Sequence, residues 1–237
     1  MAQLTRYFVQ PGSTTVDVGA SWGLFTYGQA HSTGPSGSVF SFEPNPVNRD
    51  ALGAIRDCCP GVEIFNAAAS DQDGTAELVV PVSHGRSATA QGSLAHGFSD
   101  VETEIVRVPV ARLDEMLRTA GRIQFMKIDV EGHERAVLEG ATEILSGSRP
   151  VVLIEIEQRH LDENIDELFN FIYEFDYDLW ALRTKGIVPI TEFDLERDQL
   201  DYIDGTFVPY SVGRDYVNNF LMLPRGTSHV RPSPYAR

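Results

Sequence analysis

Residues 14–23 read TTVDVGASWG, and this stretch decides the fold class. Its first half is rich in β-branched residues and predicts a short strand, while residues 24–32 predict a helix. Between them, Gly19 and Gly23 let the backbone turn tightly and approach a ligand, and the helix N-terminus offers free N–H groups. A strand, a glycine-bearing turn and a helix together form the opening unit of an α/β sheet.

Strand and helix patterns alternate along most of the remaining chain. The predicted strands at residues 123–130 and 150–157 are nearly continuous in apolar residues, as parallel strands covered on both faces are. The alternation predicts an α/β fold with an open, doubly wound, mostly parallel sheet and right-handed crossovers. The other predicted strands are residues 39–43 and 62–67, and the other predicted helices are residues 47–58, 134–145 and 161–172.

Two segments depart from this alternation. Residues 74–110 predict a strand, a loop rich in glycine, serine and histidine, and a second strand, which we interpret as a β-rich flap insertion. Residues 178–224 predict a β-rich C-terminal part whose last stretch, NNFLMLP, returns as an antiparallel strand. We expect residues 1–237 to form a single domain.

Composition excludes several classes of partner. The chain has 34 acidic and 19 basic residues, a formal charge of −15, which argues against nucleic acids and anionic membrane surfaces. It shows neither an apolar run of bilayer length nor a secretory signal. The two cysteines, Cys58 and Cys59, are adjacent and are read as reduced thiols, with metal binding as a minor alternative. We therefore expect a cytoplasmic protein, and pairing between flap edges leaves a homo-oligomer open.

An acidic residue at the end of the second predicted strand complements the glycine turn. Glu43 follows Gly23 by twenty residues, where a carboxylate can accept hydrogen bonds from both ribose hydroxyls of a nucleoside. The turn is spaced D-x-G-x-x-x-G and lacks the middle glycine of the dinucleotide fingerprint. A nucleoside without a pyrophosphate, such as S-adenosylmethionine, fits this turn better. The alternatives are an NAD-type oxidoreductase and a nucleoside-binding module without turnover.

Five stretches resemble, in order, the motifs of the FkbM-type methyltransferases: DVGASWGLFT, FSFEPNPVNRDAL, NAAASDQDGTAELVV, FMKIDVEGHERAVLEGA and PVVLIEIE. The resemblance covers residues 14–157 and implies a class I, Rossmann-like methyltransferase fold. It implies methyl transfer from S-adenosylmethionine, usually to a hydroxyl of a sugar or natural product. Ser21 stands where the family commonly has asparagine, and its hydroxyl can still form a hydrogen bond. The expected cofactor-binding residues are Asp17, Gly19, Ala20, Ser21, Trp22, Gly23, Glu43, Pro44, Asn66, Ala67 and Ala68.

Charged residues on two neighbouring apolar strands form a second candidate site. Lys127 and Asp129 share one strand face, and Glu155 lies on the next strand. Such side chains are costly inside a sheet unless they are paired or used, so Lys127 forms either a buried ion pair or part of a catalytic site. We expect Asp129 to act as the general base or to orient an acceptor hydroxyl, with His133 as the rival base.

The same carboxylates suggest a metal. Asp129 and Glu155, with His133 beside them, would form an oxygen-rich site suited to Mg²⁺ or Ca²⁺. Glu131 and Glu134 are interpreted as acids favoured near a helix N-terminus, without a catalytic duty. The sequence thus predicts a methyltransferase for a small-molecule hydroxyl acceptor, with S-adenosylmethionine as its cofactor and Mg²⁺ as an optional second one.

Overall fold

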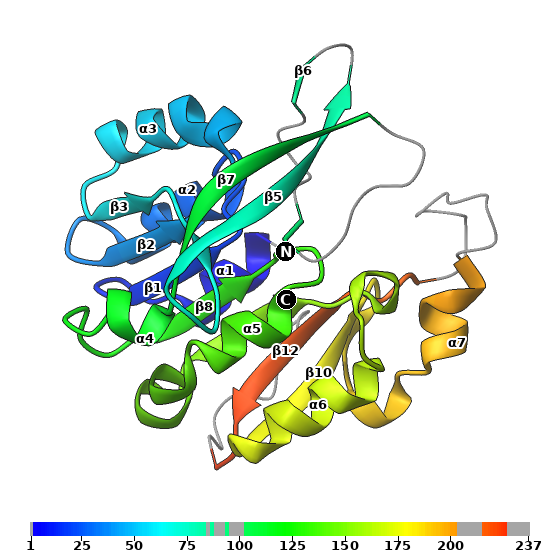
Figure 1. Ribbon diagram of the computed structural model, residues 1–237. Helices are drawn as coiled ribbons and strands as arrows, with labels where there is room; N and C mark the ends of the chain where they lie inside the picture. Colours follow the sequence, from blue (N-terminus) through cyan, green and yellow to red (C-terminus); the bar gives the residue numbers. More distant parts are fainter. Residues whose placement is uncertain (1, 84–85, 88–92, 95–101, 203–214, 227–237) are drawn as a thin grey trace.

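An eight-stranded sheet forms the centre of the protein in a computed structural model, which describes residues 2–83, 86–87, 93–94, 102–202 and 215–226 (Figure 1). The order across this sheet is β11-β10-β12-β9-β8-β1-β2-β3. The bounds are β1 Thr14–Val18, β2 Ser38–Phe42, β3 Val62–Phe65, β8 Phe125–Ile128, β9 Val151–Glu155, β10 Tyr177–Arg183, β11 Gly186–Pro189 and β12 Asn219–Pro224.

The predicted parallel sheet is confirmed. Strands β3, β2, β1, β8 and β9 pair in parallel, and β12 lies antiparallel between β9 and β10. The strand order reverses beside β1, because β2 and β3 continue on one side of it and β8 and β9 on the other. In sheets of this type, ligands bind beyond the carboxyl ends of the strands at that switch point.

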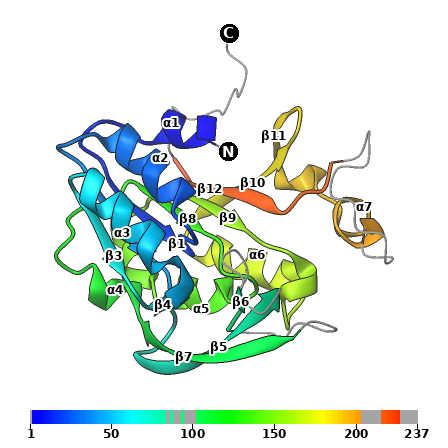
Figure 2. The same cartoon turned by 90° about the horizontal axis from the view of Figure 1, so that it is seen from above.

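Helices cover both faces of the sheet. Figure 2 shows α1, α2 and α3 on one face and α4, α5 and α6 on the other. Within the described residues, no helix has the length and apolar character needed to cross a bilayer. The bounds of the α-helices are α1 Ala2–Phe8, α2 Leu24–Thr33, α3 Arg49–Cys58, α4 Leu113–Met116, α5 Glu134–Glu139, α6 Ile165–Glu174 and α7 Leu195–Asp198. The short helical turns are η1 Pro46–Asn48, η2 Ile144–Ser148, η3 Gln158–His160, η4 Ile190–Glu192 and η5 Leu200–Tyr202.

The helix predicted at residues 134–145 is interrupted. Helix α5 ends at Glu139, and the chain resumes as the π-helical turn η2. A Cβ on Gly140 would lie 1.9 Å from the carbonyl oxygen of Ser70, so the chain approaches closely here. The Asp114 carboxylate accepts the backbone N–H groups of Glu143 and Ile144, which gives the second segment its own start. The apolar pattern identified the buried side correctly but could not reveal these tertiary contacts.

The flap insertion is confirmed as a second, smaller sheet. Strands β5 (Gly74–Ser83) and β7 (Thr103–Ala111) pair antiparallel, and β6 (Arg86–Ser87) pairs antiparallel with the end of β5. Ala68–Ala69 form β4, which pairs in parallel with β7 of this second sheet. Strand β3 therefore ends at Phe65, and the predicted strand at residues 62–67 was too long. Residues 84–85, 88–92 and 95–101 of the flap lie outside the described residues.

The C-terminal part is only partly β-structure. Strands β10 and β11 form a hairpin, and β12 is the predicted returning strand. Helix α7 and the turns η4 and η5 lie between them in the sequence, which the expectation of a β-rich segment did not include. Asp198 at the end of α7 is 2% exposed and pairs with Arg183 of β10 and with Arg197, so an ion-pair network anchors this helical segment.

Candidate active site

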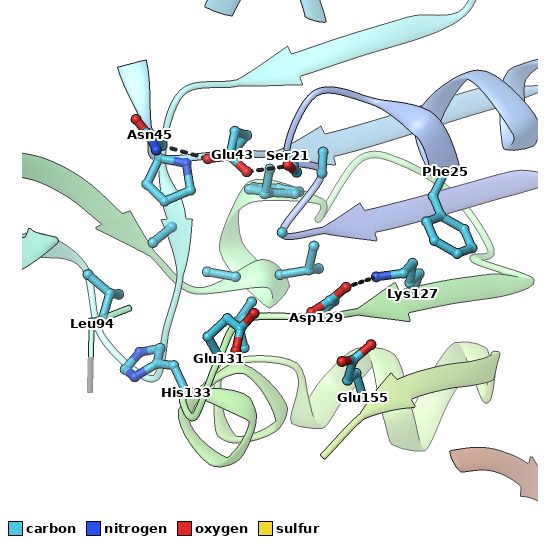
Figure 3. A pocket seen from close by; sticks show the side chains of 18 of the residues that line it. Ser21, Phe25, Glu43, Asn45, Leu94, Lys127, Asp129, Glu131, His133 and Glu155 are labelled. Carbon is cyan, nitrogen blue, oxygen red and sulfur yellow. Dashed lines mark hydrogen bonds and ion pairs between the residues drawn. The ribbon is translucent and has the colours of Figure 1, made fainter. Parts of the chain in front are cut away.

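A pocket of about 260 Å³ opens at the carboxyl ends of β1, β2, β8 and β9 (Figure 3). It lies at the switch point of the strand order, where the fold places ligands. Both candidate sites of the sequence meet in this one pocket. The predicted residues that line it are Gly19, Ala20, Ser21, Trp22, Glu43, Pro44, Ala68, Lys127, Asp129, His133 and Glu155.

The Glu43 carboxylate is locked in one orientation. Its Oε2 accepts the backbone N–H of Ser21 at 2.7 Å, and its Oε1 accepts that of Asn45 at 2.8 Å. The side chain is nearly buried, and this burial raises the pKa of Glu43 despite the two N–H donors. The side chain of Asn48 also forms a hydrogen bond with Glu43, and because a carboxylate has about four lone-pair sites, Glu43 can still accept a hydrogen bond from a ligand.

The glycines of the first turn are explained by packing. Gly19 has a φ of 78°, and a Cβ there would lie 1.8 Å from the carbonyl oxygen of Asp129. Gly23 has a φ of 94°, and its Cβ would lie 2.2 Å from the Cδ1 atom of Ile55 on α3. The sequence predicted that the backbone at these glycines approaches a ligand closely, and in the structure it closely approaches other residues of the protein. Ser21 also takes a left-handed conformation, with φ 50°, and such strain is often found at functional sites.

Lys127 and Asp129 form an ion pair. This is one of the two alternatives that the sequence offered for Lys127, the other being a part in a catalytic site. Lys127 Nζ lies 2.7 Å from Asp129 Oδ2, and its ammonium lies 4.6 Å from the centre of the Phe25 ring. The lysine side chain is 2% exposed, whereas that of Asp129 is 31% exposed. The pair thus fixes a carboxylate at the pocket wall with the ammonium of Lys127 beside it (Figure 3).

Glu155 has partners other than Lys127. Its two carboxyl oxygens accept the side-chain amides of Asn218 and Asn219 at 2.7 and 3.3 Å. Burial, followed by the negative charge of Asp129, raises the pKa of Glu155 to about 8. Glu155 is therefore largely a neutral carboxylic acid near pH 7, able to donate a hydrogen bond.

Glu131 also lines the pocket, although the sequence gave it no duty. Its Oε2 lies 3.1 Å from His160 Nε2, and its backbone has a φ of 53°. Burial and then the charge of Asp129 raise the pKa of Glu131 to about 7. The turn that carries Glu131 is close-packed, because the next residue, Gly132, lies against the backbone carbonyl of His160.

The donor set does not fit Mg²⁺. Within the described residues, no group of three or more His, Cys, Asp or Glu side chains is placed to hold a metal ion. The Lys127 ammonium already takes the place beside Asp129 that a cation would occupy, and amide groups face Glu155. Lys127 thus compensates the charge of Asp129.

Four predicted cofactor residues lie away from the pocket wall. Asp17 is fully buried in the sheet, where its Oδ2 accepts the Thr26 hydroxyl at 2.7 Å. Gly23 packs on α3, and Asn66 borders a separate hollow beside that helix. Ala67 is buried and is not part of the lining. Conversely, the lining includes residues that the sequence did not single out, namely Leu24, Phe25, Asn45, Leu78 and Leu94.

Raised carboxyl pKa values predict a stability that depends on pH. Glu131 and Glu134 have pKa values near 7 and Glu155 near 8, against 4.5 for ordinary glutamate. The folded chain therefore holds protons that the unfolded chain has released, and stability falls as the pH rises from about 5 to 8. Asp17 and Glu43, whose pKa values are also raised by burial, act in the same direction, whereas buried His133, whose pKa is lowered, acts in the opposite one.

We expect the melting temperature to be a few degrees higher at pH 6 than at pH 8, measured by differential scanning calorimetry without ligand. Glu155→Gln should flatten this dependence. The matched control is Glu63→Gln, because Glu63 is an exposed acid on β3, and it should leave the slope unchanged. A melting temperature that rises between pH 6 and 8 would contradict the buried neutral carboxyls.

Comparison with known proteins connects this geometry to a family. A model of the methyltransferase FkbM domain matches residues 17–179. No curated protein matches the chain. Among solved structures, a methyltransferase FkbM from Methylobacillus flagellatus KT is similar, with 15% identity and a TM-score of 0.53. That match covers 94% of this chain and 50% of the other, so the chain spans about half the length of that protein.

Two weaker structural matches have TM-scores below 0.5. Aeropyrum pernix fibrillarin, in complex with natively bound S-adenosyl-L-methionine, is 14% identical with a TM-score of 0.46. The match covers 93% of this chain and 72% of the fibrillarin chain. A putative O-methyltransferase from Klebsiella pneumoniae is 12% identical with a TM-score of 0.45, covering 93% and 77%. The fold is that of class I methyltransferases. Because the family match extends over well more than half of the sequence, the chain belongs to the FkbM methyltransferase family.

Proposed function

We propose that the chain transfers a methyl group from S-adenosylmethionine to a hydroxyl oxygen of a small molecule. The observation that carries this proposal is the position of two fixed carboxylates in one pocket. Glu43 is held by Ser21 and Asn45 on one side, and Asp129 is held by Lys127 on the other (Figure 3). The first suits the cofactor ribose and the second the acceptor.

The pocket fits the parts of the proposed cofactor. Glu43 would accept hydrogen bonds from the ribose hydroxyls, and the turn at Gly19–Trp22 would meet the amino-acid end. Small and apolar groups, including Ala68 and Leu78, leave room for the adenine. When bound, S-adenosylmethionine supplies the methyl group on a positively charged sulfur, and the acidic lining favours that charge.

The acceptor would bind beside Asp129. Methyl transfer needs in-line positioning and removal of the hydroxyl proton more than covalent help from the protein. Asp129 would accept the hydrogen bond of the reacting hydroxyl, and neutral Glu155 would donate one to a second acceptor oxygen. The chain's charge of −15 favours a small molecule over a nucleic acid as this acceptor.

The proposal is tested by binding and by transfer. Calorimetric titration with S-adenosylmethionine should give saturable binding, and methyl-labelled cofactor should pass its label to separate pools of sugars, phenols, amines and RNA. We expect label in a sugar or phenol pool, as a methyl ether identified by mass spectrometry. Binding without transfer to any pool would indicate a binding module, and label in RNA or amines would overturn the acceptor class. Saturable binding of a nicotinamide dinucleotide, without binding of S-adenosylmethionine, would instead support the alternative function, an NAD-type oxidoreductase.

A further inference from the structure

A second hollow lies between helix α2 and the end of helix α3, away from the pocket at the strand ends. Its volume is about 450 Å³, and its described lining shares no residue with that pocket. Figure 2 shows α2 and α3 side by side on one face of the sheet. The lining includes Tyr27 and His31 of α2 and both cysteines of the chain, Cys58 and Cys59. Methyl transfer gives these thiols no role.

The end of α3 brings the two sulfur atoms together. Successive side chains of a helix point in directions about 100° apart, so neighbouring residues in a helix do not face each other. Helix α3 ends at Cys58, and Cys59 follows in an extended conformation, with φ −119° and ψ 100°. The two Sγ atoms lie 3.4 Å apart. Neighbours in sequence have therefore become a pair of sulfur atoms on one side of the chain.

Contacts with the rest of the protein hold this pair in place. The side chain of Cys59 packs against a small core cluster that includes Val39 and Val62. The Cys58 thiol donates a hydrogen bond to the backbone carbonyl of Ile55 at 3.4 Å. Both cysteines are free, Cys58 being exposed and Cys59 half-buried. The sulfur atoms are thus positioned by the fold and accessible from the hollow.

The protonation of the pair limits the chemistry of a ligand. Burial, followed by the hydrogen bond with Cys58, raises the pKa of the Cys59 thiol. At neutral pH Cys59 is therefore a thiol rather than a reactive thiolate. A ligand that binds both sulfur atoms must displace their protons. A compound whose leaving groups are hydroxides takes up those protons as water.

The separation of the sulfur atoms selects the geometry of the ligand. Two bonds of about 2.3 Å, the usual length between a metal and a cysteine sulfur, span the 3.4 Å at an angle of about 95°. A cation that binds two sulfur atoms in line would need them about 4.6 Å apart, twice that bond length. Within the described residues no third His, Cys, Asp or Glu is grouped with the pair, as a zinc site requires. A pyramidal trivalent centre, with nearly perpendicular bonds and an oxygen in the third position, fits this arrangement.

We propose that Cys58 and Cys59 form a two-thiol site that binds trivalent arsenic, separate from the methyl-transfer site. Arsenous acid carries three hydroxides on arsenic. Two arsenic–oxygen bonds break and two arsenic–sulfur bonds form, and the two thiol protons leave with the two hydroxides as water. Arsenic stays trivalent and sulfur is not oxidised, so the step needs no oxidant or reductant. The third hydroxide stays on arsenic and faces the hollow.

Titration with arsenite tests the site in the whole protein. The protein is first reduced and freed of reductant, and bound arsenic is counted by native mass spectrometry and free thiols by a thiol reagent. We expect one arsenic per chain and the loss of both thiols, which an excess of a small dithiol restores. Cys58→Ser and Cys59→Ser should each bind at least about 100-fold more weakly, because the second bond is no longer intramolecular. His31→Gln, a change in the same hollow, is the matched control and should bind as the wild type does.

Two further measurements separate the role of the fold from simple adjacency in sequence. X-ray absorption at the arsenic edge should show two sulfur neighbours and one oxygen. In urea the affinity should be at least about tenfold lower, because both side chains must then be ordered on binding. The inference is overturned by the absence of an adduct in the wild type, by wild-type affinity in either serine variant, or by three sulfur neighbours, which would mean bridging between chains. Equal affinity in folded and urea-unfolded protein would likewise overturn it, because the fold would then contribute nothing.

Discussion

Replacing Glu43 with alanine is expected to weaken S-adenosylmethionine binding about 100-fold, measured by isothermal titration calorimetry. A hydrogen bond to a charged group contributes about 1.5–3 kcal/mol, and every 1.4 kcal/mol changes a dissociation constant about tenfold. The effect should be large because two backbone N–H groups already orient Glu43 before the ligand binds. Binding therefore costs little side-chain conformational entropy at this residue.

The controls separate this loss of binding from a loss of folding. Alanine at position 43 leaves the N–H groups of Ser21 and Asn45 without their acceptor, so the melting temperature is measured in parallel. Glu43→Gln keeps the shape and one acceptor, and we expect an intermediate affinity. Glu63→Gln on the neighbouring strand should bind as the wild type does. An unchanged dissociation constant in a folded Glu43→Ala protein would refute the ribose role.

The second large effect is expected at Asp129. In Asp129→Asn the methyl-transfer rate should fall about 100-fold, because a misplaced reacting group costs about that factor. The affinity for S-adenosylmethionine should remain close to the wild-type value. Asparagine retains an oxygen toward Lys127 but removes the charge that the ammonium compensates, so some loss of stability accompanies the loss of rate.

The pH dependence of the residual activity assigns the roles. If Asp129 only orients the acceptor and another group takes the proton, Asp129→Asn lowers the rate at every pH and leaves the acidic limb of the profile in place. Loss of that limb in Asp129→Asn would instead make Asp129 the base. Asp50→Asn, an exposed acid on α3, serves as the matched control and should retain full activity.

Most of the fold could be predicted because its signals are local. The runs of β-branched and apolar residues in Thr14–Val18 and Val151–Glu155 predict buried strands, and this prediction does not require knowledge of their neighbours in the sheet. The end of α5 could not be predicted, because it depends on Asp114 and on the close approach of Ser70 to Gly140. The single domain expected for the whole chain stays a prediction.

The candidate site divides in the same way. Glu43, Asp129 and Glu155 could be identified because carboxyl groups at the ends of parallel strands meet at one edge of the sheet. Asn66 and Asp17 were placed at the cofactor by motif, yet Asn66 borders another hollow and Asp17 lies inside the sheet. A motif gives the place of a residue in the chain, but it does not tell which neighbours its side chain contacts in the folded protein.

By itself, the sequence determined the α/β alternation, the flap, the family and the edge of the sheet where acids gather. Only the tertiary structure decided which partners these groups have: Lys127 pairs with Asp129 rather than Glu155, and His133 meets Ser70. The physical reason is range. Periodicity and turn chemistry act over a few neighbouring residues, whereas protonation states depend on burial and on charges that distant segments bring together.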